Sequence, residues 1–156
     1  MIKYVPGMTN VVLEEIPGKV TLAVEISNCR GSCVGCHSPW LKTDVGEPLT
    51  EEVVDALIAD NFGVNCFLLL GEGRDPEAVL RIAAHLRRKY PLIETAIYSG
   101  REEVEDELFD AFDYVKVGPY IAEFGPLNIE TTNQRLFHHR EDITSRFWHR
   151  GLENKK

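Results

Sequence analysis

Four short apolar segments alternate with helix-forming segments along this chain of 156 residues. They cover residues 20–26, 66–70, 94–98 and 114–117, and they are rich in the β-branched and aliphatic side chains of buried strands. Regular alternation of strand and helix favours βαβ units and a mostly parallel sheet. We therefore expect a single α/β domain over residues 1–156, with a core spanning about residues 20–120 and a polar C-terminal tail over 121–156.

Helices are expected after the first three strands, over residues 51–61, 76–90 and 101–112. Thr50 is a suitable N-cap for the first helix, and Asp75 followed by Pro76 is a typical helix start for the second. Right-handed crossovers bring the loops that follow parallel strands to one edge of the sheet. Ligands of such folds bind at this carboxyl edge, so its loops are the first place to expect a site.

The charge balance is acidic, with 17 Lys and Arg against 25 Asp and Glu. Nucleic-acid binders normally present a basic face, so we expect no nucleic-acid partner. The first residues lack the apolar region of a signal peptide, and the longest apolar run, residues 64–70, is too short to span a bilayer. These features predict a cytoplasmic protein without a membrane partner.

Three of the four cysteines follow the first strand with the spacing C-x3-C-x2-C: Cys29, Cys33 and Cys36. Cytoplasmic thiols stay reduced, so a tight cysteine group there indicates metal binding or catalysis rather than disulfides. Thiolates are the ligands that iron–sulfur clusters prefer. The interpretation we favour is a 4Fe–4S cluster with three protein ligands, whose fourth iron is open to a small molecule.

Other readings of the same cysteines stay open at this point. Cys33 and Cys36 form a C-x-x-C pair that is typical of redox thiols, and buried cysteines without a function are common. Cys66, distant in sequence, is interpreted as a small core residue. A zinc site is the main rival, and its fourth ligand would come from one of these residues: His37, Cys66, His85, His138, His139 or His149.

Several segments together resemble the radical S-adenosylmethionine enzymes, and among them the activating proteins of anaerobic ribonucleoside-triphosphate reductase. The C-x3-C-x2-C spacing at the end of a first strand is the signature of the superfamily. The resemblance runs from about residue 20 to residue 134. Beyond the cysteines, it is carried by Gly35-Cys36-His37, Pro39-Trp40, Leu70-Gly71-Glu72-Gly73, Tyr98-Ser99-Gly100, Gly118-Pro119-Tyr120 and residues 131–135.

The resemblance implies a small partial (β/α) barrel and an oxidoreductase that activates a glycyl-radical enzyme. Cys29, Cys33 and Cys36 would hold the 4Fe–4S cluster, and S-adenosyl-L-methionine would bind its open iron. Reductive cleavage of the cofactor would give a 5′-deoxyadenosyl radical, which takes a hydrogen atom from a glycine near the C-terminus of the reductase. A flavodoxin-type protein would supply the electron. The expected cofactor contacts are Gly35, Cys36, His37, Gly71, Glu72 and Gly73, with no catalytic residue beyond cluster and cofactor.

The segment 71–76 departs from the Gly-Gly-Glu-Pro of that family, so either Glu72 or Asp75 is expected to receive the amino group of the cofactor. Asn133 and Gln134 would contact the cofactor or simply turn the chain. Aromatic candidates for docking the reductase are Trp40, Tyr120, Phe137 and Trp148. The alternative functions are a radical enzyme with another partner and a zinc-stapled binding module.

Overall fold

The computed structural model describes residues 2–13, 15–27, 46–119, 121, 123–124, 130 and 132–147. Several residues with a predicted function lie outside this part of the chain, and the structure gives no account of them: Cys29, Cys33, Gly35, Cys36, His37, Trp40, Tyr120, Trp148 and His149.

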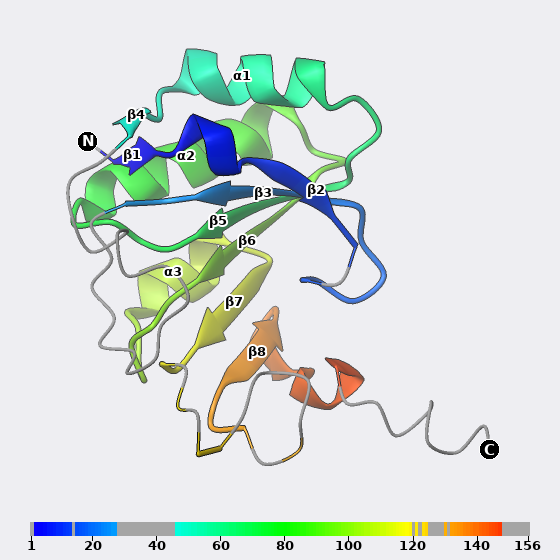
Figure 1. Cartoon of the computed structure of the whole chain (residues 1–156), viewed down its shortest axis with the longest axis vertical. Helices are drawn as coiled ribbons and strands as arrows, with labels where there is room; N and C mark the ends of the chain where they lie inside the picture. The colour runs from blue at the N-terminus through cyan, green and yellow to red at the C-terminus, as the bar shows by residue number, and fades with distance from the viewer. Residues whose placement is uncertain are drawn as a thin grey trace.

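The protein is an α/β fold with a mostly parallel mixed sheet of seven strands (Figure 1). The four central strands, β3 (Thr21–Glu25), β5 (Cys66–Leu70), β6 (Glu94–Tyr98) and β7 (Tyr114–Val117), are parallel neighbours in this order. Antiparallel strands continue the sheet on both sides, β2 (Asn10–Val12) beside β3 and then β8 (Arg135–His138) and β9 (Glu141–Asp142) beyond β7. The predicted α/β class is confirmed.

Helices follow β3, β5 and β6, as the alternation predicts. They are α1 (Glu51–Asp60), α2 (Pro76–Lys89) and α3 (Asp106–Ala111). The side chains of Thr50 and Asp75 accept hydrogen bonds from the Val53 and Ala78 amides at 3.2 Å, which confirms both predicted N-caps. Among the described residues, none of the helices has the length and apolar character needed to cross a membrane.

The predicted start of the third helix at residue 101 is wrong, because α3 begins at Asp106. The Arg101 amide donates to the Ser99 side chain at 3.0 Å, and the Arg101 carbonyl accepts from the Gly118 amide at 2.6 Å. These tertiary hydrogen bonds hold the backbone of residue 101 in a loop, and the helix starts only beyond it.

The sheet extends past the core that the sequence analysis delimited. Residues 135–138 and 141–142, placed in a polar tail, form β8 and β9, and residues 10–12 form β2. These strands are only two to four residues long and carry polar side chains at their ends, and Leu136 of β8 is the one fully buried residue among them, so their local sequence gives a weak strand signal. Leu136 and Ile143 are buried against the sheet, at 0% and 3% exposure.

Two apolar cores lie on opposite faces of the sheet. The helix-covered face contains Leu22, Val24, Phe67 and Leu69 from the strands, packed against α1, α2 and α3. The other face is lined by Ile16, Ala23, Leu68, Leu136 and Ile143, with no contribution from the three helices. Smaller elements complete the described chain: β1 (Lys3–Tyr4) paired with β4 (Glu47–Pro48), and the 3-10 turns η1 (Pro6–Met8) and η3 (Thr144–Phe147).

A partly buried polar network joins α1 to α2. The Asp55 carboxylate accepts from Lys89 Nζ at 2.7 Å and from the Tyr90 hydroxyl at 2.7 Å, and it lies 2.8 Å from His85 Nε2. The hydrogen bond from Lys89 holds the pKa of Asp55 well below its usual range, against the opposing effect of burial and with further help from His85 and Tyr90. The network therefore favours the ionised carboxylate in the folded state.

Replacing Asp55 by Asn is expected to lower the free energy of unfolding at neutral pH. Because the folded pKa lies below the unfolded value of 3.8, the stabilisation is complete above about pH 4 and is lost as the pH falls further. Urea unfolding of both proteins across this range should show the gap narrowing with acidification. Asp60→Asn, on the exposed end of the same helix, is the matched control. An Asp55→Asn deficit that does not change between pH 7 and pH 3 would contradict the assignment.

Candidate functional site at the carboxyl edge of the sheet

The described residues that follow β3, β5, β6 and β7 lie together at the carboxyl edge, as the topology predicts. Gly71, just after β5, packs so closely on β3 that a Cβ there would lie 3.2 Å from the Ile26 carbonyl oxygen. The Ser99 hydroxyl, just after β6, donates to the Glu72 carboxylate. Backbone hydrogen bonding between Arg101 and Gly118 then joins the β6 and β7 loops. The described loops at this edge are in direct contact.

Glu72 is a buried carboxylate at this edge, only 8% exposed. Arg101 grips it with two parallel bonds, from Nε to Oε2 at 2.9 Å and from Nη2 to Oε1 at 2.5 Å. This ion pair and a second one with Glu105 at 2.9 Å raise the pKa of the Arg101 guanidinium. Such bidentate pairing fixes both position and orientation of the carboxylate. Arg101 was not among the predicted site residues, because nothing in the local sequence indicates that it contacts Glu72.

Gly71 and Gly73 are required by the backbone of this loop. Their φ values are +131° and +64°, in the region that side chains disfavour, and a Cβ on Gly73 would come within 2.9 Å of Ile2 Cγ2. The two glycines therefore place Glu72 at the end of β5. This accounts for both of them without any ligand contact.

Glu72 and Asp75, the two carboxylates predicted as candidates to receive the amino group of the cofactor, have different roles in the structure. Asp75 caps α2 through the Ala78 amide, and hydrogen bonding lowers its pKa. Glu72 instead points from the strand end toward the loops of β6. Of the two, Glu72 is placed at the edge where the strand-end loops converge.

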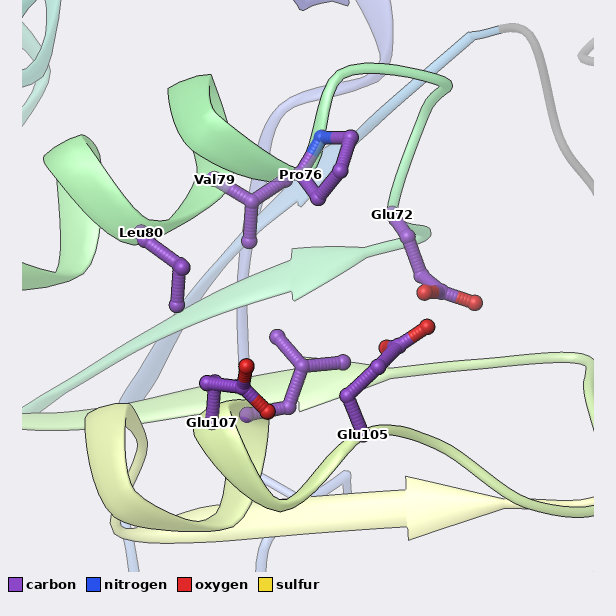
Figure 2. A pocket seen from close by; sticks show the side chains of 7 residues that line it. Glu72, Pro76, Val79, Leu80, Glu105 and Glu107 are labelled. Carbon is purple, nitrogen blue, oxygen red and sulfur yellow. The ribbon is translucent and has the colours of Figure 1, made fainter.

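A small pocket of about 210 Å³ lies beside Glu72 on the helix side of the edge. Figure 2 shows Glu72 and Glu105 at its mouth, with Val79, Leu80 and Pro76 of α2 along its wall. Glu107 and Leu108 of α3 complete the lining. Because Arg101 already pairs with Glu72 and Glu105, the rest of the lining is mostly apolar and favours an apolar group.

A second group of polar side chains lies at the same edge, on the sheet face away from the helices. One residue from each of the four central strands is paired with the next across the sheet, and together they form a single row: Glu25, Leu70, Tyr98 and Lys116. Lys116 Nζ lies 4.8 Å from the centre of the Tyr98 ring, and Tyr98 donates its hydroxyl hydrogen to the Glu15 carbonyl. Burial, together with Glu15, raises the pKa of Glu25.

The sequence analysis missed this row, although a signal for it exists. Glu25 ends β3 and Lys116 stands next to last in β7, so both charges interrupt otherwise apolar strands near the carboxyl end. All four side chains are partly exposed, whereas the row one step below, Ala23, Leu68, Ala96 and Tyr114, is buried. The row is therefore accessible and polar where the rest of this face is closed.

Asn133 and Gln134 hold the chain after β7. The Asn133 side chain donates to the Pro119 carbonyl at 3.0 Å, and the Gln134 side chain donates to the Gly118 carbonyl at 3.3 Å. Both amides thus fasten the segment before β8 to the β7 loop. Of the two roles that the sequence allowed, the structure shows the one of turning and anchoring the chain.

Ser27 is the last described residue after β3, and its fully buried hydroxyl has no hydrogen-bond partner within the described part of the chain. The cysteine segment begins two residues further on, at Cys29. Cys66 lies at the opposite end of the neighbouring strand, four residues before its carboxyl end, a distance of about 13 Å along the strand. Burial raises the pKa of its thiol to about 12, so this cysteine stays protonated and is a poor metal ligand.

Searches for a matching protein family, for similar curated proteins and for similar solved structures found no match to this chain.

Proposed function

We propose that the protein is a radical S-adenosylmethionine enzyme that installs the glycyl radical of an anaerobic ribonucleoside-triphosphate reductase. The observation that supports this most is the position of the cysteine segment. The C-x3-C-x2-C motif begins in the sequence two residues after Ser27, the last described residue beyond β3, and the Glu72 carboxylate lies at the end of the adjacent strand β5.

The residues fit the two groups that this function requires. Cys29, Cys33 and Cys36 offer three soft thiolates, the donor set of an iron–sulfur cluster with an open iron. When bound, the cluster and S-adenosyl-L-methionine supply reductive cleavage of a sulfur–carbon bond and a carbon-centred radical. Gly35 and His37 flank the last thiolate, and we propose that they contact the cofactor.

Glu72 is proposed to accept a hydrogen bond from the amino group of the cofactor's methionine. A carboxylate has about four lone-pair sites, and Ser99 and Arg101 together occupy three of them. The remaining acceptor site is on Oε1. Arg101 orients the Glu72 carboxylate, while Gly71 and Gly73 set the turn that places it.

The row on the sheet face opposite the helices is proposed to line the space between cofactor and substrate peptide. Glu25 and Lys116 lie at the carboxyl end of their strands, and Lys116 contacts the Tyr98 ring. A carboxylate and an ammonium group there can bind a polar ligand such as a ribose or a peptide backbone. Leu70 and Tyr98, between them, shield it from water.

The test is to purify the protein without oxygen, reconstitute it with iron and sulfide, and reduce it with S-adenosyl-L-methionine and the reductase. Electron paramagnetic resonance should then show a glycyl doublet on the reductase. Methionine and 5′-deoxyadenosine should be released only with the reduced protein. Release of both products without a reductase signal would redirect the proposal to another glycyl-radical partner.

A zinc-stapled binding module predicts a different outcome. The purified protein would be colourless, hold one tightly bound zinc ion and release no 5′-deoxyadenosine. A colourless, zinc-containing protein that releases no 5′-deoxyadenosine would contradict the radical mechanism. A brown protein that loses its colour in air would support it.

A further inference from the structure

A second group of potential ligands lies at the amino edge of the sheet, at the far end of the strands from Glu72. It consists of Glu94, His138 and His139, which each offer one donor atom, and these atoms lie within 4.8 Å of one another. Glu94 begins β6, His138 ends β8, and His139 opens the connection to β9. Sequence reasoning considered the two histidines only as partners of the cysteines and did not connect them to Glu94.

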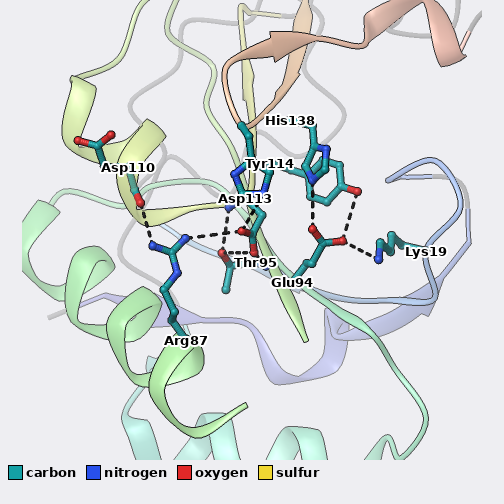
Figure 3. A network of polar contacts seen from close by, with 9 residues as sticks. Lys19, Arg87, Glu94, Thr95, Asp110, Asp113, Tyr114 and His138 are labelled. Atoms are coloured by element: carbon teal, nitrogen blue, oxygen red, sulfur yellow. Dashed lines mark hydrogen bonds and ion pairs between the residues drawn. The ribbon is translucent and has the colours of Figure 1, made fainter. Parts of the chain in front are cut away.

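Contacts around Glu94 leave one of its oxygens directed at the histidines. Lys19 Nζ lies 2.5 Å from Oε1, and the Tyr114 hydroxyl donates to the same oxygen at 3.5 Å. The other oxygen, Oε2, lies 3.1 Å from His138 Nε2 (Figure 3). Two ligands of one zinc ion at bond lengths of about 2.1 Å are separated by about 3.0–3.4 Å, so this pair already has a suitable spacing.

The rings of both histidines are held in place by neighbours. His138 stacks on Tyr114, with the ring centres 4.2 Å apart and the planes 17° from parallel. His139 Nε2 faces the Asp113 carboxylate at 3.4 Å, and Asp113 is itself fixed by the Thr95 amide at 2.8 Å. Metal-binding histidines typically use their second nitrogen on such a carboxylate, which orients the ring.

The backbone of the β8–β9 connection is strained. His139 and Arg140 have φ values of 49° and 71°, and a two-residue hairpin connection of this kind normally uses Asn-Gly. A side chain at positive φ costs stability, and such strain is frequently found at functional sites. The strain here places the His139 ring 4.4 Å from the His138 ring.

We propose that Glu94, His138 and His139 bind a borderline divalent metal ion, with Zn²⁺ as the first candidate. Two imidazole nitrogens and one carboxylate oxygen form the donor set that zinc, cobalt and nickel prefer over magnesium or calcium. The ion replaces the proton between His138 Nε2 and Glu94 Oε2, and water completes its coordination. It fastens the β8–β9 hairpin to the start of β6. The nearby cations Lys19 and Arg87 lower the affinity for the ion.

Cobalt(II) titration of the full chain separates this site from the cysteines. Cobalt(II) that is bound only by nitrogen and oxygen ligands shows weak visible absorption bands. Cobalt(II) bound by thiolates shows an additional intense band in the near ultraviolet. We expect a cobalt spectrum without thiolate absorption in protein whose Cys29, Cys33 and Cys36 are replaced by Ser, and a rise of Tm on addition of Zn²⁺.

Two substitutions remove the imidazoles and keep the local structure. His138→Phe retains a ring against Tyr114, and His139→Asn suits the positive φ better than histidine does. Each should weaken cobalt binding about tenfold or more without lowering the Tm of the metal-free protein. Cobalt binding that is unchanged when both histidines are replaced, or no cobalt binding to the protein with the three cysteine-to-serine substitutions, would overturn the proposal. Neither result bears on radical formation at the other edge.

Discussion

Replacing Arg101 by Ala should destabilise the protein by about 2–3 kcal/mol, because it leaves the Glu72 charge buried with only the Ser99 hydroxyl as a partner. Breaking a fully buried ion pair costs about 3–5 kcal/mol, and the partial exposure of the Arg101 side chain, 22%, places this pair below that range. Urea unfolding monitored by circular dichroism gives the difference directly.

Three further variants determine which interaction is responsible. Arg101→Lys keeps the charge and loses the parallel pair of N–H donors, so it should cost about 1 kcal/mol. Glu105→Gln removes only the exposed partner and should change stability by less than about 0.5 kcal/mol. Glu72→Gln combined with Arg101→Ala removes both charges and should recover part of the loss. An Arg101→Ala protein as stable as the wild type would show that Glu72 does not depend on this pair.

Replacing any one of Cys29, Cys33 and Cys36 by Ala should abolish cleavage of S-adenosyl-L-methionine, since two thiolates cannot retain a cluster that needs three. Production of 5′-deoxyadenosine by the anaerobically reconstituted, reduced protein is the measurement. The visible absorbance of the cluster and the iron content should fall in parallel.

Cys66→Ala is the matched control for this experiment. The Cys66 side chain is fully buried, its pKa is raised to about 12, and it begins β5 at the edge opposite Glu72. The variant should cleave the cofactor at the wild-type rate and lose about 1 kcal/mol of stability through the missing sulfur atom. Loss of cleavage in Cys66→Ala would mean that the cluster has a different set of ligands.

Local sequence patterns predicted the central part of the fold well. The bounds of β5, β6 and β7 and the caps of α1 and α2 agree with the pattern, because burial on both faces selects apolar runs and capping selects Thr50 and Asp75 locally. The predicted start of α3 was wrong because the Arg101 backbone forms hydrogen bonds with the Ser99 side chain and with the Gly118 amide. Neither residue belongs to the predicted helix, so the helical pattern of residues 101–112 gives no sign of these bonds. Strand β8 was missed because it is four residues long, begins with Arg135 and ends with His138, and buries only Leu136 completely.

Some features of the candidate site were likewise predictable from the sequence and others were not. The convergence of the strand-end loops follows from handedness and was predictable, and so was Glu72 as one of two carboxylates in the β5 loop. The partners of Glu72 were not predictable. Arg101 is 29 residues away in sequence, and its contact with Glu72 exists only because β5 and β6 are neighbours.

By itself, the sequence determined the α/β class, the order of the central elements and the edge at which their loops meet, because periodicity, caps and crossover handedness are local properties of the chain. The tertiary structure alone decided which charges pair, that Asp75 caps a helix while Glu72 stays at the edge, and that Cys66 lies at the other end of its strand. It also brought Glu94 to two histidines 44 and 45 residues further along the chain. Such contacts depend on strand order and register, which no local pattern encodes.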